Sequence, residues 1–215
     1  MNYINIAKKL IHLLLADPWV FYSYIKALLI GCFYIVYYRL TTANVVIKFP
    51  FFVYYKFKVT GAGSVFIDRG CSVYANSFDG LVITTLSPNA KVAIGKGCDL
   101  GGMTIRCHNM ITLGNFVMSA NCLLQDIVFP VARLFDVKNS AVINIEPSAN
   151  CLSIGDKVWL ASQTIVLGNS SVGEASVLGV GSVCIDRKIN NSHLAVGNPI
   201  SSSISIERIE KMVGI

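Results

Sequence analysis

A strict period of six residues near the C-terminal end constrains the fold of this chain more than any other feature. Branched apolar residues recur at every sixth position through five consecutive hexads. These positions are Ile154, Leu160, Val166, Val172 and Leu178. A period of six fits neither the 3.6-residue turn of an α-helix nor the alternation of an ordinary strand. It indicates a solenoid in which every sixth side chain points toward a common axis.

The residues beside these inward positions support the same fold. Gly or Ala follows four of the five, and Val, Thr or Ser stands four places further on. Glycine or alanine leaves room for the backbone to turn, and small β-branched or hydroxyl residues suit tight corners. Three hexads then form one triangular coil of eighteen residues, stacked on the next at about 4.8 Å. We therefore predict a mainly β fold, a left-handed parallel β-helix.

Three segments carry a resemblance to a known family. They are Ile154-Gly-Asp-Lys-Val-Trp-Leu, Val177-Leu-Gly-Val-Gly-Ser-Val and Val196-Gly-Asn-Pro. In order and spacing they resemble the hexapeptide-repeat acyltransferases, in particular bacterial O-acetyltransferases that modify surface polysaccharides. The resemblance covers roughly residues 90–200. It implies acetyl-coenzyme A as co-substrate, a sugar acceptor and a homotrimer.

Composition and repeat regularity divide the chain into four parts. The N-terminal part is apolar and rich in aromatic residues, and the hexads become regular from Ile94. The end of the chain reads as a short helix over 204–212 that caps the open last coil. We predict an apolar helical, membrane-associating appendage (1–40), first strands and degenerate coils (41–93), the β-helix acyltransferase domain (94–200) with a loop excursion over 125–150, and a C-terminal capping helix (201–215).

Positive charge is concentrated near the N-terminus. The net charge is +6, and residues 1–60 account for the whole excess, with seven basic residues against one acidic residue. The repeat domain is close to neutral, which argues against nucleic acid as a partner. A hydrophobic content of 53% with only 14% charged residues also excludes a disordered chain.

The N-terminal part reads as two helices, over 5–16 and 19–38, separated by Asp17-Pro18. The second is long enough to span a bilayer, but Lys26 in its interior would have to reach back to the interface. Attachment to the membrane surface is an alternative, because Trp and Tyr favour the interface and basic residues attract anionic lipid. A third alternative is packing against the solenoid or a neighbouring subunit. We expect the protein in the bacterial cytoplasm, at the inner face of the cytoplasmic membrane.

The seven cysteines show no Cys-x-x-Cys pair. Cys98 and Cys184 fall where the repeat needs a small inward or corner residue, so we expect buried thiols rather than disulfides or metal ligands. This suits a reducing cytoplasm. We expect no metal cofactor, because a metal-dependent carbonic anhydrase on such a scaffold needs three suitably spaced histidines and the hexads offer only His108.

The repeat is interrupted over 125–150, where the enzymes of the resembled family carry their catalytic segment. In that family Asp-x-His is followed by an aromatic-Asp pair and an Ile-Asn pair, and the histidine is the general base. This chain keeps the second half of the pattern, as Phe135-Asp136 and Ile143-Asn144. The resemblance therefore makes Asp136 a catalytic-site residue.

The position of the family histidine holds no base in this chain. Counting back from Asp136 places it at Ala132, and counting forward from Asp126 places it near Pro130. General-base assistance contributes about two to four powers of ten in rate, so the loss matters. Three interpretations stay open: a pseudoenzyme, a chain whose histidine at position 132 was replaced by alanine in the laboratory, and an enzyme whose base lies elsewhere.

His108 is the candidate for a relocated base. It precedes Asp126 by eighteen residues, which is one coil, so the two stack if the register holds. A carboxylate beside an imidazole orients it and makes it more basic. The alternative is a corner histidine that faces water.

The cofactor-binding residues are carried over from the resemblance. Trp159 stands where related O-acetyltransferases keep a Trp that borders the acetyl pocket. Val180 replaces a residue that is usually Ala, which narrows the groove. Backbone groups at two corners are expected to hold the pantetheine arm, and a cation to meet the nucleotide phosphates: Ala161, Ser162, Gly179, Val180 and Arg187.

The sequence thus predicts an acetyl-coenzyme A-dependent O-acetyltransferase that acts on a sugar hydroxyl of a bacterial surface polysaccharide or its glycolipid-linked precursor. The alternative, from a different class, is a non-catalytic trimeric scaffold or a pseudoenzyme that keeps its affinity for coenzyme A. The vacant histidine position leaves both open.

Overall fold

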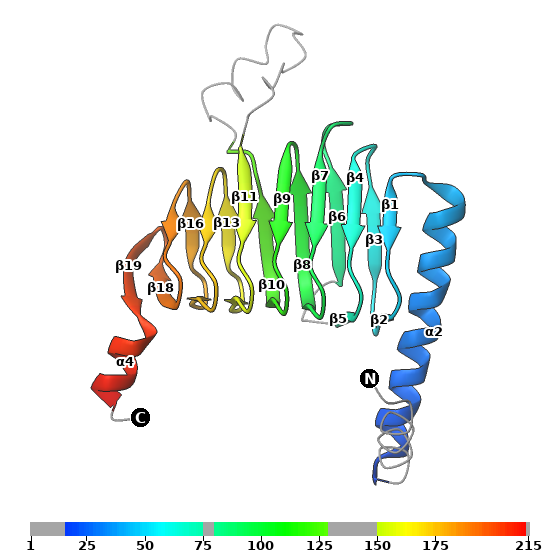
Figure 1. Cartoon of the computed structure of the whole chain (residues 1–215), viewed down its shortest axis with the longest axis horizontal. Helices are drawn as coiled ribbons and strands as arrows, with labels where there is room; N and C mark the ends of the chain where they lie inside the picture. Colours follow the sequence, from blue (N-terminus) through cyan, green and yellow to red (C-terminus); the bar gives the residue numbers. More distant parts are fainter. Residues whose placement is uncertain (1–15, 75–79, 129–149, 214–215) are drawn as a thin grey trace, which may run out of the picture.

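Parallel strands wind into a stack of triangular coils with one helix at each end (Figure 1). The computed structural model describes residues 16–74, 80–128 and 150–213. The helices are α2 (Pro18–Thr41) and α4 (Ile206–Val213). The strands are β1 (Val45–Ile47), β2 (Phe51–Val53), β3 (Phe57–Thr60), β4 (Ser64–Ile67), β5 (Cys71–Tyr74), β6 (Leu81–Thr85), β7 (Lys91–Ile94), β8 (Asp99–Cys107), β9 (Met110–Leu113), β10 (Met118–Gln125), β11 (Cys151–Ile154), β12 (Trp159–Leu160), β13 (Ile165–Leu167), β14 (Ser171–Val172), β15 (Val177–Leu178), β16 (Val183–Ile185), β17 (Lys188–Ile189), β18 (His193–Gly197) and β19 (Ile200–Ser205).

Each strand from β1 to β18 pairs in parallel with a strand one coil away. One sheet runs β1-β4-β7-β9-β11-β14-β17, and the second runs from β2 to β19 and includes the branch through β13 and β16. Strand β8 and strand β10 are long, and each pairs with strands of two different faces. In the regular hexads the offset is eighteen residues, as between Leu160 and Leu178. The predicted coil length is therefore confirmed.

The predicted inward positions form the core. All five are buried, and so are the residues four places further on: Val158, Thr164, Ser170, Ser176 and Ser182. Three of these residues donate their hydroxyl groups to backbone carbonyl oxygens: Thr164 to Ala161 at 2.6 Å, Ser170 to Leu167 at 2.7 Å and Ser176 to Asn190 at 2.7 Å. These three polar groups are thereby satisfied inside a narrow apolar core, whereas the hydroxyl of Ser182 has no partner among the described residues. Cys98 and Cys184 are buried thiols, as predicted.

Glycine after the inward residue is required by the close approach of the next coil. A Cβ atom placed on Gly155 would lie 2.7 Å from the backbone nitrogen of Glu174 and 3.0 Å from the carbonyl carbon of Gly173. Gly114 and Gly173 meet the next coil in the same way. The small residue predicted from the hexads is thus explained by contact between coils.

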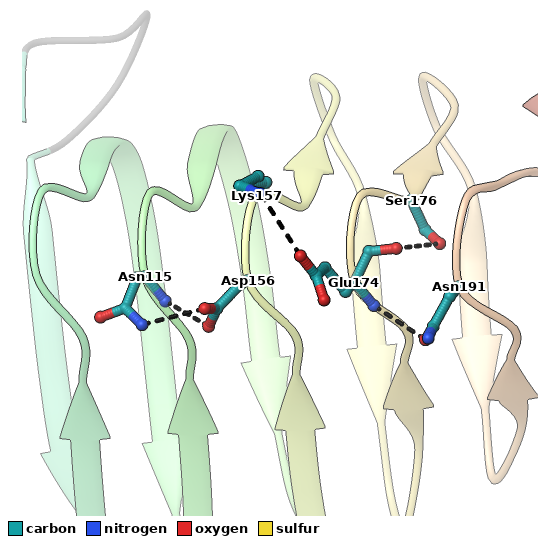
Figure 2. A network of polar contacts seen from close by, with 6 residues as sticks. All are labelled: Asn115, Asp156, Lys157, Glu174, Ser176 and Asn191. Carbon is teal, nitrogen blue, oxygen red and sulfur yellow. Dashed lines mark hydrogen bonds and ion pairs between the residues drawn. The ribbon is translucent and has the colours of Figure 1, made fainter.

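Side-chain oxygens of one coil cap backbone N–H groups of its neighbour at this corner (Figure 2). The carboxylate of Asp156 accepts from the backbone N–H of Asn115 at 2.8 Å and from its side-chain amide at 3.0 Å. These two bonds hold the pKa of Asp156 below its usual value. Asn191 accepts from the N–H of Glu174 at 3.1 Å, and Lys157 pairs with Glu174 at 3.4 Å.

A helix covers the first coil, and the last coil is closed differently from the prediction. Helix α2 packs against β1 and β2, the edge strands of the first coil. The predicted helix over 5–16 falls almost wholly outside the described residues. At the other end β19 pairs antiparallel with β18, so a strand covers the last coil. Helix α4 begins only after this strand and is largely exposed, because β19 already occupies the edge that the helix was expected to cap.

Gly155→Ala is expected to lower the free energy of unfolding by about 1–3 kcal/mol, because the new methyl group meets backbone atoms that cannot move alone. Thermal unfolding followed by circular dichroism measures the loss, and a midpoint lower by several degrees is expected. Ser171→Ala, at a half-buried outward position of the next coil, is the matched control and should change little. Equal midpoints for both variants would show that the coils can move apart.

Candidate functional site

Four of the predicted cofactor-binding residues meet at one corner. Strand β12 leads into Ala161 and Ser162, and β15 leads into Gly179 and Val180 one coil further on. The N–H of Ala161 donates to the carbonyl oxygen of Leu178 at 3.0 Å. The N–H of Gly181 donates to the carbonyl oxygen of Ser162 at 2.9 Å. The four residues thus lie on successive coils at one corner, and their role in binding the cofactor stays a prediction.

This corner differs from the one in Figure 2 because, among the described residues, no side chain caps its amides. The backbone N–H groups of Ser162 and Val180 have no hydrogen-bond acceptor among the described residues. They lie one coil apart, which is about 4.8 Å. Val180 is 74% exposed, and a Cβ atom on Gly181 would meet nothing within 4 Å. The corner therefore presents two donors to solvent, and a chain with carbonyl groups could accept from both.

Trp159 lies on the outer face just before this corner. Its side chain is 51% exposed, and in the ladder it stands between Met118, which is 52% exposed, and Val177. A half-exposed indole on a strand is available as an apolar wall for a ligand. Trp159, Ser162 and Val180 thus form one continuous candidate site.

A groove on the neighbouring face begins beside the same corner. It has a volume of about 490 Å³, and its lining includes Arg106, Asn121, Leu123, Gln163 and Ile165. Arg106 is exposed and brings a positive charge to the groove. Sequence reasoning did not single out this arginine, because it stands in an irregular coil that precedes the clear hexads.

Arg187 is not brought to this corner. It follows β16, so a whole face of the coil separates it from Gly179 and Val180. Its N–H donates to the hydroxyl of Ser170 at 3.3 Å, and its carbonyl oxygen accepts from Ser171 at 2.8 Å. The guanidinium group is exposed at the next corner of the same chain.

Asp126 lies at that other corner, at the start of the predicted excursion. Its side chain is fully buried, and its carboxylate accepts three backbone N–H groups: from His108 at 2.7 Å, Asn109 at 2.6 Å and Met110 at 2.9 Å. Across the excursion, the side chain of Asn150 donates to the carbonyl oxygen of Asp126 at 3.0 Å. Asp126 thus fixes the turn of the preceding coil, a structural task that the sequence did not indicate.

The predicted stacking of His108 on Asp126 is wrong by one residue. The coil between β8 and β10 has nineteen residues, so Arg106 pairs with Gln125 and Asp126 continues the register opposite Cys107. The carboxylate then bonds the backbone of His108 rather than its ring. The imidazole is half-buried, and its Nδ1 atom has no partner among the described residues. The physical reason is the corner between Arg106 and Thr112, which is two residues longer than the matching corner between Leu167 and Ser171. The stretch after Gly114 has the regular length.

The remaining catalytic candidates, Ala132 and Asp136, lie in 129–149, outside the described residues. Within the described part of the chain, no group of three or more His, Cys, Asp or Glu side chains could hold a metal ion. The described half of the site therefore consists of backbone donors, an indole and a nearby arginine.

These features define a left-handed β-helix of hexapeptide repeats, and solved structures share it. A mutant of AntD, an N-acyltransferase from Bacillus cereus, in complex with dTDP and coenzyme A, matches with a TM-score of 0.54 and 13% identity over 82% of this chain and 94% of that one. A second AntD mutant, in complex with dTDP-4-amino-4,6-dideoxyglucose and coenzyme A, matches with a TM-score of 0.50 and 13% identity over 80% and 88%. At this identity the likeness concerns the fold.

Sequence comparison adds one relative. "Putative acetyltransferase C18B11.09c" of Schizosaccharomyces pombe is 35% identical over 99 residues, which are 46% of this chain and 44% of that protein. The chain thus spans less than half the length of this curated relative. No family model matches the chain. The resemblance to hexapeptide-repeat acyltransferases is confirmed at the level of the fold.

Asp126→Ala is expected to lower the free energy of unfolding by about 3 kcal/mol or more, because three backbone N–H groups lose their acceptor. Asp126→Asn keeps one acceptor oxygen and should fall between this variant and the original chain. Urea unfolding measures both. The comparison is Asp186→Ala at the same corner of a later coil, which should cost less, because this exposed carboxylate accepts one backbone N–H, from Asn169 at 2.7 Å. Unchanged stability in Asp126→Ala together with lost transfer activity would contradict the structural role.

Proposed function

We propose that this chain is an acetyl-coenzyme A-dependent O-acetyltransferase whose acceptor is a sugar hydroxyl of a bacterial surface polysaccharide or its precursor. The observation that carries the proposal is the corner with two uncapped amides, at Ser162 and Val180, beside the exposed indole of Trp159. The named acetyltransferase relative and the acyltransferase structures with coenzyme A support it.

The corner suits the pantetheine arm of the co-substrate. That arm carries two amide groups, whose carbonyl oxygens can accept from the N–H groups of Ser162 and Val180. The indole of Trp159 would border the acetyl group and exclude water from the thioester. The Val180 side chain stands over this corner, where the resembled family usually has alanine, so the groove is narrower here.

A second chain would complete the binding groove. The corner of one coil stack is convex, so it can contact an extended ligand from one side only. We infer a homotrimer, in which the groove lies between two stacks. In such a groove Arg187 could bind the nucleotide phosphates of coenzyme A. One chain would hold the pantetheine arm at the corner of Ser162 and Val180, and the other would supply Arg187 from its own next corner.

The transfer follows from the chemistry of a thioester. A base takes the proton of the sugar hydroxyl, and the oxygen attacks the carbonyl carbon of the acetyl group. The new carbon–oxygen bond forms as the carbon–sulfur bond breaks, and the thiol of coenzyme A leaves with a proton. Backbone N–H groups stabilise the negative charge that develops on the carbonyl oxygen. Asp136 would orient the base, as the Phe-Asp pattern implies.

The identity of the base separates the proposal from its alternative. The family position is Ala132, which cannot take a proton, and His108 is held through its backbone by Asp126. The vacant position favours a second candidate function, a trimeric scaffold or pseudoenzyme that binds coenzyme A without turnover. We retain the enzyme as the main proposal because Phe135-Asp136 and Ile143-Asn144 keep the family pattern around Ala132.

Trp159→Ala is expected to weaken binding of coenzyme A by about tenfold or more, because the ligand loses its apolar wall. Isothermal titration calorimetry measures the dissociation constant. Met118→Ala is the matched control, since Met118 is equally exposed in the same ladder and one coil further from Gly179. An equal loss in both variants, or none in either, would contradict this assignment of the pocket.

Ala132→His is expected to raise acetyl transfer by about tenfold or more, because it restores a general base. His108→Ala should leave the transfer rate nearly unchanged. The assay follows release of free thiol with an acceptor sugar that related enzymes use. If His108→Ala abolishes transfer and Ala132→His has no effect, His108 is the base instead. Coenzyme A binding without turnover in every variant would establish the pseudoenzyme.

A further inference from the structure

Helix α2 is apolar on two opposite sides, and the first coil covers only one of them. The inner side is buried at Ala27, Gly31 and Tyr38. The helix is long and apolar enough to cross a membrane, and only 11% of its most apolar stretch is buried against the rest of the chain. The outer side exposes large apolar residues along its whole length: Trp19, Tyr22, Leu29, Phe33, Val36 and Leu40.

Specific contacts fix the inner side to the solenoid. A side chain on Gly31 would collide with the carbonyl group of Phe51, so the helix lies directly against β2. The hydroxyl of Tyr38 accepts from the backbone N–H of Val59 at 2.8 Å. The ring of Tyr34 lies 5.3 Å from that of Phe57, edge to face. A helix that crossed a bilayer would have to break these contacts and expose the edge of the first coil.

The position of α2 determines where its outer side points. It lies at the N-terminal end of the stack, against the edge strands β1 and β2 (Figure 1). Its outer side therefore faces away from the coils, along the axis of the solenoid. A flat surface could touch this side without meeting the candidate site, which lies several coils further along.

Charge and side-chain type indicate what covers this surface. Lys26 and Arg39 are exposed on α2, and Lys56, just before β3, and Lys58, within β3, are exposed as well. Residues 1–60 hold the whole positive excess of the chain. Trp19, Tyr22 and Tyr37 are of the types that favour the boundary between lipid and water. A second copy of the helix would bring these positive charges together, whereas an anionic lipid surface attracts them.

We propose that α2 lies flat in the interface of an anionic membrane with its outer side toward the lipid, and holds the solenoid upright on the membrane. This goes beyond the proposed function and does not depend on it. Attachment is then by one helical surface, and the inner side of α2 keeps its packing on β2.

Sedimentation with vesicles tests the attachment. The full chain should bind vesicles of phosphatidylglycerol and phosphatidylcholine, bind phosphatidylcholine alone more weakly, and lose affinity as salt is raised. Leu29→Glu combined with Phe33→Glu should reduce binding about tenfold or more. Ile204→Glu, an exposed apolar position at the far end of the stack, should not. Circular dichroism confirms that each variant is folded, and equal binding by all variants would overturn the proposal.

Tryptophan depth distinguishes a helix that lies flat from one that spans. The chain has two tryptophans, so Trp159→Phe leaves Trp19 as a single probe. Adding Trp19→Phe with either Leu29→Trp or Leu40→Trp moves the probe along the outer side. Quenching by lipids brominated at known depths should place all three probes equally shallow. A probe at position 29 near the bilayer centre, with position 19 shallow, would refute the flat helix.

Analytical ultracentrifugation tests whether a second copy of the chain covers the outer side instead. In that case the original chain would not bind vesicles, and its mass in solution would be larger than that of the double glutamate variant.

Discussion

Backbone hydrogen bonds between successive coils determine which residues of this molecule lie next to one another. They align Leu160 with Leu178, and they stack Ser162 next to the corner of Gly179. Because the side-chain period of a strand is two, a change of one residue in coil length must be absorbed at a corner if the inward residues are to stay inward. The chain contains such changes, with an offset of nineteen between Asp99 and Met118 and of seventeen between Val177 and Leu194.

The three corners of the stack satisfy their backbone in different ways. At one corner, asparagine and aspartate side chains such as Asp156 and Asn191 cap the N–H groups of the adjacent coil. At a second, the buried carboxylate of Asp126 collects three N–H groups. The third corner leaves Ser162 and Val180 without an acceptor among the described residues. Donors that face solvent can exchange their water for the carbonyl oxygens of a ligand, so this corner is available for binding.

The sequence predicted the regular coils well because their inward residues repeat without interruption from Ile154 to Leu178. It could not predict the partner of Asp126, since the single extra residue between Asp99 and Met118 lies in a stretch with no clear hexads. The sequence also could not predict that the N–H of Val180 lacks a cap, because this depends on whether the neighbouring coil places an acceptor atom beside it. The packing of α2 on β2 depends on the absence of a side chain at Gly31. A single glycine in an apolar helix does not indicate which strand it will contact.

The coil stack also acts as a spacer of fixed length. Strand β12 stands four rungs from β2, and β15 stands five. At about 4.8 Å a rung, the corner of Ser162 and Val180 lies roughly 20–25 Å from β2, and α2 lies on the far side of that strand. On a membrane, that height would favour an acceptor that projects several sugar units above the lipid over one attached directly to it. The number of coils before the site would then measure how far a saccharide must have grown before it can be modified.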